Sequence, residues 1–201
     1  MPMLPRLALA GLLISTLALS AHAEQRTYTL DSGHTDVIVA WDHFGLAQPS
    51  AMFNHITGTL VFDPAHPTQA SVSASIPVSS IHTASDALNG HLQASDFLDA
   101  AKYPNITFKS TAVKAGATDK QLLVTGDLSL HGVTKPVTLD VTINKIGERH
   151  GKPAVAFNAK TTIQRSEFGV NKYVPMVSDA LQVTLTTGAV ASDPVAKAKA
   201  K

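Results

Sequence analysis

The sequence predicts an all-β domain in which about eight antiparallel strands form a sheet that closes as a barrel or folds over as a sandwich. Three observations lead to this prediction. Most of the chain alternates apolar and polar residues with the period of two that a half-buried strand requires. Short turns rich in Gly, Pro, Asn and Asp separate the alternating runs. Only one short segment, near residues 85–101, has the pattern of a helix.

The strands are expected in two groups, one on each side of the helical segment. The expected strands of the first group are 27–30, 37–41, 52–63 and 72–78. The expected strands of the second group are 105–109, 122–130, 137–143, 155–163 and 181–185. Gly58 interrupts the longest run of the first group, which indicates a bend or a bulge. Each run has one apolar face, and an antiparallel sheet of this kind must fold over on itself to bury that face.

The helical segment is expected in two pieces that run into a strand. Ser85 can cap a first turn, and Asn89-Gly90 is expected to break it. Ser95 is a candidate N-cap for the second piece, with Asp96 in the first turn, where the helix dipole favours a negative charge. Pro104 ends the helix and directs the chain into the next strand. A lone helix in an all-β chain indicates a barrel with one covered end.

The composition of the inward faces predicts an apolar cavity. Aromatic residues make up only 5% of the chain, and the apolar faces consist mostly of Val, Leu, Ile, Ala and Gly. Side chains of this size would leave a long eight-stranded barrel incompletely filled, and barrels of that number can enclose one small ligand. A sandwich core is built from the same residues, so the pattern alone leaves the choice between barrel and sandwich open.

The first 23 residues have the pattern of a secretory signal peptide. Arg6 is their only charged residue, an apolar run follows from Leu7 to Leu19, and Ala21-His22-Ala23 has the small-x-small form of a cleavage site. The run is shorter than the roughly 20 residues of a membrane span, so a retained anchor is the weaker alternative. We expect cleavage after Ala23, a barrel domain over residues 24–188 and a disordered Ala/Lys tail over residues 189–201.

Composition and charge exclude several classes of function. The chain has no cysteine, which excludes disulfides and thiolate metal sites. Cleavage would remove Arg6 and leave the basic residues balanced by the 15 acidic ones. No basic stripe of the kind that binds nucleic acid is present, so nucleic acid is not an expected partner.

Several stretches in order resemble one family of proteins. They are LDSGHTDVIVAWDHFG (30–45), HLQASDFLDAAKYPNITFKS (91–110), GDLSLHGVTKPVTLDV (126–141), RSEFG (165–169) and VSDALQVTLT (177–186). Together they resemble the YceI-like, or polyisoprenoid-binding, family over residues 27–187. The resemblance implies an elongated, lipocalin-like antiparallel barrel whose apolar pore holds a long isoprenoid or fatty-chain amphiphile. It also implies export to the periplasm.

Two positions depart from the pattern of that family. The family usually has an Arg-Asp pair shortly before its helical His-Leu, and Asn89-Gly90 stands there in this chain. Trp41 occupies a position where phenylalanine is common. We therefore expect the contacts to a polar head group, and the shape of the pocket, to differ from those of other members.

A long-chain lipid such as a prenyl phosphate or a quinone is the expected ligand, with no other cofactor. The residues expected to line or cap the pore are Val39, Trp41, Phe44, Phe53, Phe97, Leu98, Phe108, Leu128, Leu139, Val141 and Phe168. Each of them could equally be an ordinary core residue, because in a small barrel the core and the pocket are the same surface. The candidates for contact with a polar head are Arg165, Lys172 and Lys102. Transient contact with a membrane and a homodimer are further expectations about partners.

Three other functions compete with lipid binding. A hydrolase could use a cluster of acidic residues and a histidine, namely Asp86, His91, Asp96 and Asp99, although no G-x-S-x-G nucleophile motif is present. A metal site could form if His34, His43 and His91 meet at one end of the barrel, although no H-x-H or H-E-x-x-H motif is present. A partner-binding β-domain would have a filled core. The sequence favours a lipid-binding protein without catalytic residues or a metal.

Overall fold

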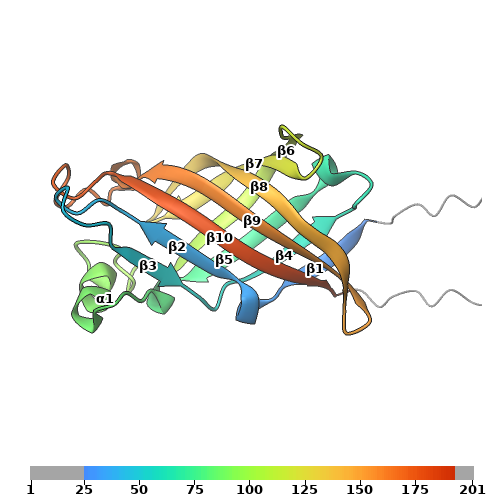
Figure 1. Cartoon of the computed structure of the whole chain (residues 1–201). Helices are drawn as coiled ribbons and strands as arrows, with labels where there is room; N and C mark the ends of the chain where they lie inside the picture. Colours follow the sequence, from blue (N-terminus) through green and yellow to red (C-terminus); the bar gives the residue numbers. More distant parts are fainter. Residues whose placement is uncertain (1–24, 193–201) are drawn as a thin grey trace, which may run out of the picture.

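The computed structural model describes residues 25–192, which form one elongated barrel of antiparallel strands (Figure 1). Its strands are β1 (Arg26–Leu30), β2 (Asp36–Ala40), β3 (Ser50–Phe53), β4 (Thr57–Phe62), β5 (Ser71–Pro77), β6 (Asn105–Ala115), β7 (Gln121–Leu130), β8 (Val133–Arg149), β9 (Lys152–Gln164) and β10 (Ala180–Ala191). Its helices are α1 (Asp86–Gln93) and the short 3-10 turns η1 (Ser32–His34), η2 (Pro67–Gln69), η3 (Val78–Ser80) and η4 (Arg165–Phe168). None of the helices in residues 25–192 is long and apolar enough to cross a membrane.

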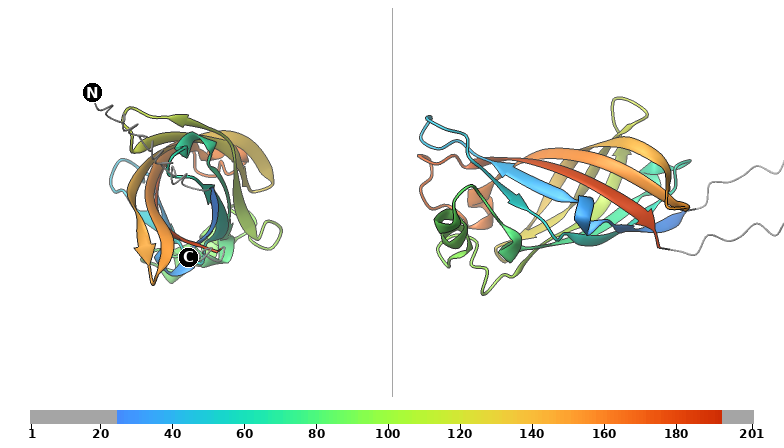
Figure 2. Two further views of the ribbon diagram at one scale, coloured as in Figure 1. Left: turned by 90° about the vertical axis from the view of Figure 1, so that its right-hand side faces the viewer. Right: turned by 60° about the horizontal axis from the view of Figure 1, so that its bottom comes forward.

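The ten labelled strands occupy eight positions in a closed ring. The turn η1 separates β1 from β2, and a three-residue break separates β3 from β4, so each pair continues along one line of the barrel. The ring follows the order β1-β4-β5-β6-β7-β8-β9-β10. It closes through β10, whose first half pairs with β2 and whose last residues pair with β1. The view along the barrel shows this ring (Figure 2, left). The predicted closed barrel of eight antiparallel strands is confirmed, and the sandwich is excluded.

The period of two in the sequence places the apolar faces inside the ring. Val124 on β7 lies opposite Leu139 on β8, and Val183 on β10 lies opposite Val39 on β2. These residues pack against the buried core, whereas the intervening Thr184 is exposed. Because the alternation is kept across neighbouring strands, the register of each pair brings apolar side chains together.

The helix occupies only the first half of the helical segment that the sequence predicted over residues 85–101. Ser85 caps α1 as expected, since its side chain accepts a hydrogen bond from the Leu88 N–H at 3.4 Å. The predicted break at Asn89-Gly90 is wrong, because α1 runs through both residues. The predicted N-cap at Ser95 is also wrong: residues 95–102 form turns rather than a helix. A glycine inside a helix costs only about 1 kcal/mol relative to alanine.

The side chain of Asn89 fixes the helix to the loop before it. Its amide oxygen accepts a hydrogen bond from the Thr83 N–H at 2.6 Å, and its amide group donates to Asp86 at 3.3 Å. Asn89, which stands where the family usually has a charged pair, therefore stabilises the start of the helix in this chain.

The two ends of the barrel are built differently. At one end lie α1 and the loops that follow β2 and β9, as the views of Figures 1 and 2 show. We call this the helical end. β1 begins and β10 finishes at the opposite end, which we call the terminal end. β10 extends to Ala191, so the predicted domain boundary at 188 lies three residues too early. The predicted signal peptide, 1–23, and the rest of the predicted tail, 193–201, lie outside the described residues.

Candidate functional site

A cavity of about 680 Å³ occupies the interior of the barrel. Ligand-binding pockets in proteins commonly measure about 300–1,000 Å³. Its wall consists almost entirely of the inward apolar side chains of the strands, and no acidic residue contributes to it. The expectation that Val, Leu, Ile, Ala and Gly would leave the interior unfilled is therefore confirmed.

Most of the apolar residues predicted to line the pore do line the cavity. The lining includes nine of them: Val39, Trp41, Phe53, Phe97, Leu98, Phe108, Leu128, Leu139 and Val141. They come from β2, β3, the turns after α1, and β6 to β8, so the wall is assembled from distant parts of the sequence. Contact between these residues and a lipid stays a prediction.

Two predicted lining residues lie elsewhere. Phe44 is at the tip of the loop after β2, where its side chain is 50% exposed. Phe168 in η4 is fully buried but does not reach the cavity. Neither Phe44 nor Phe168 lines the cavity, because both lie in loops at the helical end, where the alternation of the strands no longer determines the direction of a side chain. A capping role for either residue stays a prediction.

An aromatic cluster lies toward the terminal end of the barrel. Phe62 and Phe157 both line the cavity, and their rings meet edge to face with centroids 5.7 Å apart. Tyr28 adds a second edge-to-face contact to Phe62 at 6.4 Å. Edge-to-face contacts of this kind stabilise aromatic pairs. None of the three was among the predicted lining residues, although Phe62 and Phe157 fall on inward positions of expected strands.

Aromatic side chains from α1 and from two loops meet at the helical end of the cavity. His91, Phe97 and Tyr173 all line the cavity. The His91 ring lies 4.7 Å from Phe97 and 6.5 Å from Tyr173, centroid to centroid, and it is nearly parallel to the latter. They join α1, which carries His91, and the turns after it, which carry Phe97, to the loop between η4 and β10, which carries Tyr173. We call this group, with the ion pair described next, the mouth clasp.

An ion pair completes the mouth clasp. The Lys172 ammonium donates a hydrogen bond to the Asp96 carboxylate, and it also lies 5.6 Å from the ring centroid of Phe97 and 5.1 Å from that of Tyr173. The hydrogen bond from Lys172 lowers the pKa of Asp96, and the same bond raises the pKa of Lys172. Lys172, predicted to meet a polar head, is thus paired within the protein.

Replacing Asp96 by asparagine should weaken the fold only where the carboxylate is charged. Because the folded state lowers the pKa of Asp96 below its ordinary value of 3.8, the ion pair stabilises the fold above that pH. Its contribution is lost as the pH falls through the lower pKa of the folded state. We expect the urea concentration at the midpoint of unfolding to be lower for Asp96→Asn than for the wild type at pH 7. At pH 2 the two midpoints should be the same.

The exposed Asp119, in the turn between β6 and β7, provides a matched control. Asp119→Asn should leave the urea midpoint unchanged at pH 7. An Asp96→Asn variant as stable as the wild type at pH 7 would contradict the stabilising role of the ion pair.

Arg165 is buried and holds a loop in place. Its side chain is 4% exposed, although it contributes to the cavity wall. Its guanidinium donates hydrogen bonds to four backbone carbonyl oxygens, those of Ser178 (2.9 Å), Val170 (2.8 Å), Lys172 (2.8 Å) and Val177 (3.0 Å). Four of the five N–H groups of the guanidinium are therefore taken. This geometry favours a structural role over the predicted contact with a polar head.

The remaining head-group candidate also contacts its own neighbour. Lys102 lies with its ammonium 5.1 Å from the centroid of the Tyr103 ring, and it does not line the cavity. A hydrogen bond to Tyr103 raises the pKa of Lys102. Neither of the two lysine candidates is therefore an unpaired cation that points into the cavity.

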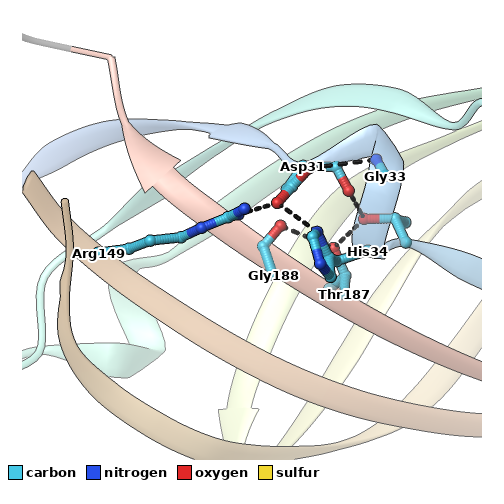
Figure 3. Close-up of polar contacts among 7 residues, drawn as sticks. Asp31, Gly33, His34, Arg149, Thr187 and Gly188 are labelled. Atoms are coloured by element: carbon cyan, nitrogen blue, oxygen red, sulfur yellow. Dashed lines mark hydrogen bonds and ion pairs between the residues drawn. The ribbon is translucent and has the colours of Figure 1, made fainter.

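Two threonine hydroxyls lie in the cavity wall where η1 meets β10, and Figure 3 draws the polar contacts around Thr187. Thr35 and Thr187 both line the cavity, and their hydroxyl oxygens lie 2.8 Å apart. The Thr35 hydroxyl donates to the carbonyl oxygen of Asp31 at 2.8 Å, and the Thr187 hydroxyl has two acceptors for its one hydrogen, the Thr35 hydroxyl and the Gly188 carbonyl oxygen at 3.3 Å. Both hydrogens are used internally, and a ligand would meet only acceptor lone pairs there. No pattern in the sequence indicates this pairing, which joins η1 to β10.

The residues of the two competing chemistries are arranged for other purposes. Asp96 binds Lys172 and Asp86 contacts Asn89, so both carboxylates have hydrogen-bond partners other than His91. His34 binds Asp31 at 2.8 Å beside Arg149, as Figure 3 shows, whereas His43 and His91 line the cavity. Within residues 25–192 no group of three or more metal-ligating side chains is close enough to hold an ion.

Curated relatives match most of the chain. A UPF0312 protein of Pseudomonas putida strain W619 is 36% identical over 165 residues, which cover 80% of this chain and 85% of the relative. A UPF0312 protein of Pseudomonas syringae pv. tomato is 35% identical over 183 residues, covering 89% of this chain and 94% of the relative.

Solved structures share the barrel. BcnA of Burkholderia cenocepacia superposes with a TM-score of 0.72 at 26% identity and covers 79% of this chain and 98% of its own. The YceI protein of Campylobacter jejuni gives 0.68 at 25% identity, covering 76% and 90%. A polyisoprenoid-binding domain from Saccharophagus degradans gives 0.62 at 14% identity, covering 82% and 98%, and shares the fold.

The family assignment follows from these matches and from the geometry. The YceI-like domain family matches residues 28–189, which include all of β2 to β9 and most of β1 and β10. The motifs that predicted the resemblance lie in β2, in the segment after α1, in β7 and β8, in η4 and in β10. The chain belongs to the YceI-like family.

Proposed function

We propose that this protein binds one long-chain amphiphile, an isoprenoid such as a prenyl phosphate or a quinone, with the chain inside the barrel and the polar head at the helical end. The observation that carries the proposal is the apolar cavity of about 680 Å³. Burial of hydrocarbon is favourable by about 0.8 kcal/mol per methylene, so a dry apolar wall is sufficient for affinity. The Saccharophagus neighbour is named for polyisoprenoid binding, which supports the same ligand class.

The orientation of the ligand follows from the two ends of the cavity. Phe62, Phe157 and Tyr28 fill the terminal end with aromatic rings. The helical end carries His43, His91 and the mouth clasp, where a polar head can meet hydrogen-bonding groups and water. The chain would therefore enter with its apolar end first.

The same arrangement supports binding without catalysis. The wall of the cavity offers no carboxylate, and Arg165 and the Thr35–Thr187 pair use their donors within the protein. We infer that the protein carries, stores or senses its ligand. The pattern of the first 23 residues supports export to the periplasm, where such a carrier would protect a hydrocarbon chain from water.

A titration against chain length tests the proposal. Prenyl alcohols of increasing length, added in detergent below its micelle concentration, should bind with affinity that rises by roughly fourfold per methylene equivalent until the cavity is full. The affinity should then level off. Affinity that does not depend on chain length, or no binding of any chain, would contradict a lipid-filled cavity.

A further inference from the structure

Large exposed apolar side chains gather at the helical end of the barrel. Seven large apolar residues are exposed within residues 25–192, and four of them lie in two loops at this end: Phe44, Leu46, Tyr173 and Met176. The exposed fraction of Leu46 is 89% and that of Met176 is 55%. The other three stand apart on strands β2, β7 and β8. We call the four residues the apolar tip.

The two loops of the apolar tip are fastened to each other. The Phe44 N–H donates a hydrogen bond to the Met176 carbonyl oxygen at 2.9 Å, and the Ser178 N–H donates to the Asp42 carbonyl oxygen at 2.9 Å. A bridge between His43 and Val177 lies between these bonds. Figures 1 and 2 show the two loops side by side at the end that carries α1. The apolar tip is therefore one ordered surface.

The backbone presents Phe44 in an unfavourable conformation. Phe44 and Gly45 have φ values of 60° and 70°, and the Leu46 N–H donates to the His43 carbonyl oxygen at 3.1 Å. These angles and this bond describe a type I′ turn, whose first central position favours Asn, Asp or Gly. A bulky residue with positive φ is strained, and such strain concentrates at functional positions. Tyr173 shares this feature, with φ of 65°.

The apolar tip is continuous with the cavity. His43 and Ala47, which flank the Phe44–Leu46 turn, line the cavity, and so does Val177 next to Met176. Tyr173 belongs to both surfaces. A hydrocarbon chain that leaves the cavity at this end would pass along apolar groups up to the outermost residue, Leu46.

We propose that the apolar tip docks on the surface of a lipid bilayer, with Phe44, Leu46 and Met176 inserted among the head groups. The inference rests on the lipid binding proposed above and extends it, because a carrier that meets the membrane at its mouth can exchange a chain without exposing it to water. Aromatic and long apolar side chains at an exposed edge are typical of proteins that bind the bilayer interface.

The charge of the helical end indicates which force drives docking. Its loops carry six carboxylates: Asp42, Asp86, Asp96, Asp99, Glu167 and Asp179. They carry three cations: Lys102, Arg165 and Lys172. A surface with excess negative charge is not attracted to anionic lipids. Docking should therefore depend on apolar insertion and not on salt.

Flotation with phosphatidylcholine vesicles tests the inference on the full chain. The wild type should bind, and raising the salt from low to high concentration should change the bound fraction by less than about twofold. The double variant Phe44→Asn/Leu46→Gln should bind at least about tenfold more weakly. Asparagine suits the first position of a type I′ turn, so this variant should keep its melting temperature.

A matched control uses exposed apolar residues away from the apolar tip. Ile38→Gln/Leu123→Gln removes two such side chains from the barrel wall and should leave vesicle binding unchanged. A wild type that does not bind phosphatidylcholine vesicles, or a tip variant that binds as well as the wild type, would overturn the inference. Binding that requires anionic lipid and disappears at high salt would overturn it as well.

Sedimentation velocity without lipid distinguishes membrane docking from self-association through the apolar tip. The wild type should sediment as the same species as the tip variant. A wild-type dimer that becomes monomeric in the tip variant, without vesicle binding, would assign the tip to contact between two copies of the chain and overturn docking.

The titration with prenyl alcohols in detergent separates the failure of docking from the failure of the proposed ligand. Wild type and tip variant should take up the chains equally well, because the substitutions leave the cavity wall intact. Chain uptake without vesicle binding would overturn docking alone, and vesicle binding without chain uptake would overturn only the proposed ligand.

Discussion

Replacing Arg165 by methionine is expected to lower the free energy of unfolding by about 3–5 kcal/mol, because four buried or partly buried carbonyl oxygens would lose their donor. For a domain of this size the melting temperature should fall by roughly 10 °C. Methionine keeps an unbranched apolar stem and removes the guanidinium, so the loss reports chiefly the hydrogen bonds. Thermal and urea unfolding measure both quantities.

Arg149→Met is the matched control for this prediction. The Arg149 side chain is 42% exposed and forms an ion pair with Asp31 at the surface. An exposed pair contributes about 0–1 kcal/mol, so this variant should lose no more than about 1 kcal/mol of unfolding free energy, well below the loss expected in Arg165→Met. If Arg165→Met were no less stable than Arg149→Met, Arg165 would not be the residue that holds the loop 169–179.

Blocking the cavity is expected to abolish most of the affinity for a chain. Val183 lies on β10 between Val39 and Thr161, and all three line the cavity. In Val183→Trp the indole would occupy space that the ligand needs. Displacing three methylene groups would cost about 2.4 kcal/mol, roughly a fifty-fold loss of affinity. Titration with a fluorescent prenyl probe measures this loss.

The neighbouring position on the same strand supplies the control. Thr184 is exposed and faces away from the cavity, so Thr184→Trp adds the same side chain outside the barrel. Its affinity for the probe should equal that of the wild type. Equal affinity in Val183→Trp would show that the chain binds somewhere other than the cavity.

The strands could be predicted because successive side chains of a strand point to opposite faces of the sheet. This geometry produces both the alternation of apolar and polar residues in the sequence and the burial of every second side chain. A strand such as β7 buries every second residue, so Leu122, Val124 and Leu128 identify its inward face without knowledge of the partner strands. The same reasoning predicted the unfilled interior, since it needs only the size of the inward residues.

The helix and the loops could not be predicted in the same way. The stop expected at Asn89-Gly90 followed local propensity, but Asn89 binds Thr83 and a loop contact outweighs that propensity. Phe44 and Phe168 were assigned to the pore by their size, although their direction depends on the turn at Gly45 and on η4. The direction of a side chain in a loop is determined by tertiary contacts, and the spacing of residues in the sequence does not predict these contacts.

The polar groups of the site needed the structure for a related reason. Arg165 was expected at a head group because cations often meet phosphates, but its four carbonyl partners come together only when the loop 169–179 folds back. The contact between Lys172 and Asp96 joins residues 76 positions apart. Such pairings depend on which loops lie side by side. The alternating pattern of the strands does not predict them.

The most direct test of lipid binding is a native mass spectrum of the protein purified from the organism that makes it, followed by solvent extraction of whatever it carries. We predict one long-chain amphiphile for each protein molecule, absent from Val183→Trp and present in Thr184→Trp. A spectrum that shows only the mass of the polypeptide, together with no uptake of added prenyl or quinone chains, would contradict the central claim that the hollow of the barrel holds a lipid.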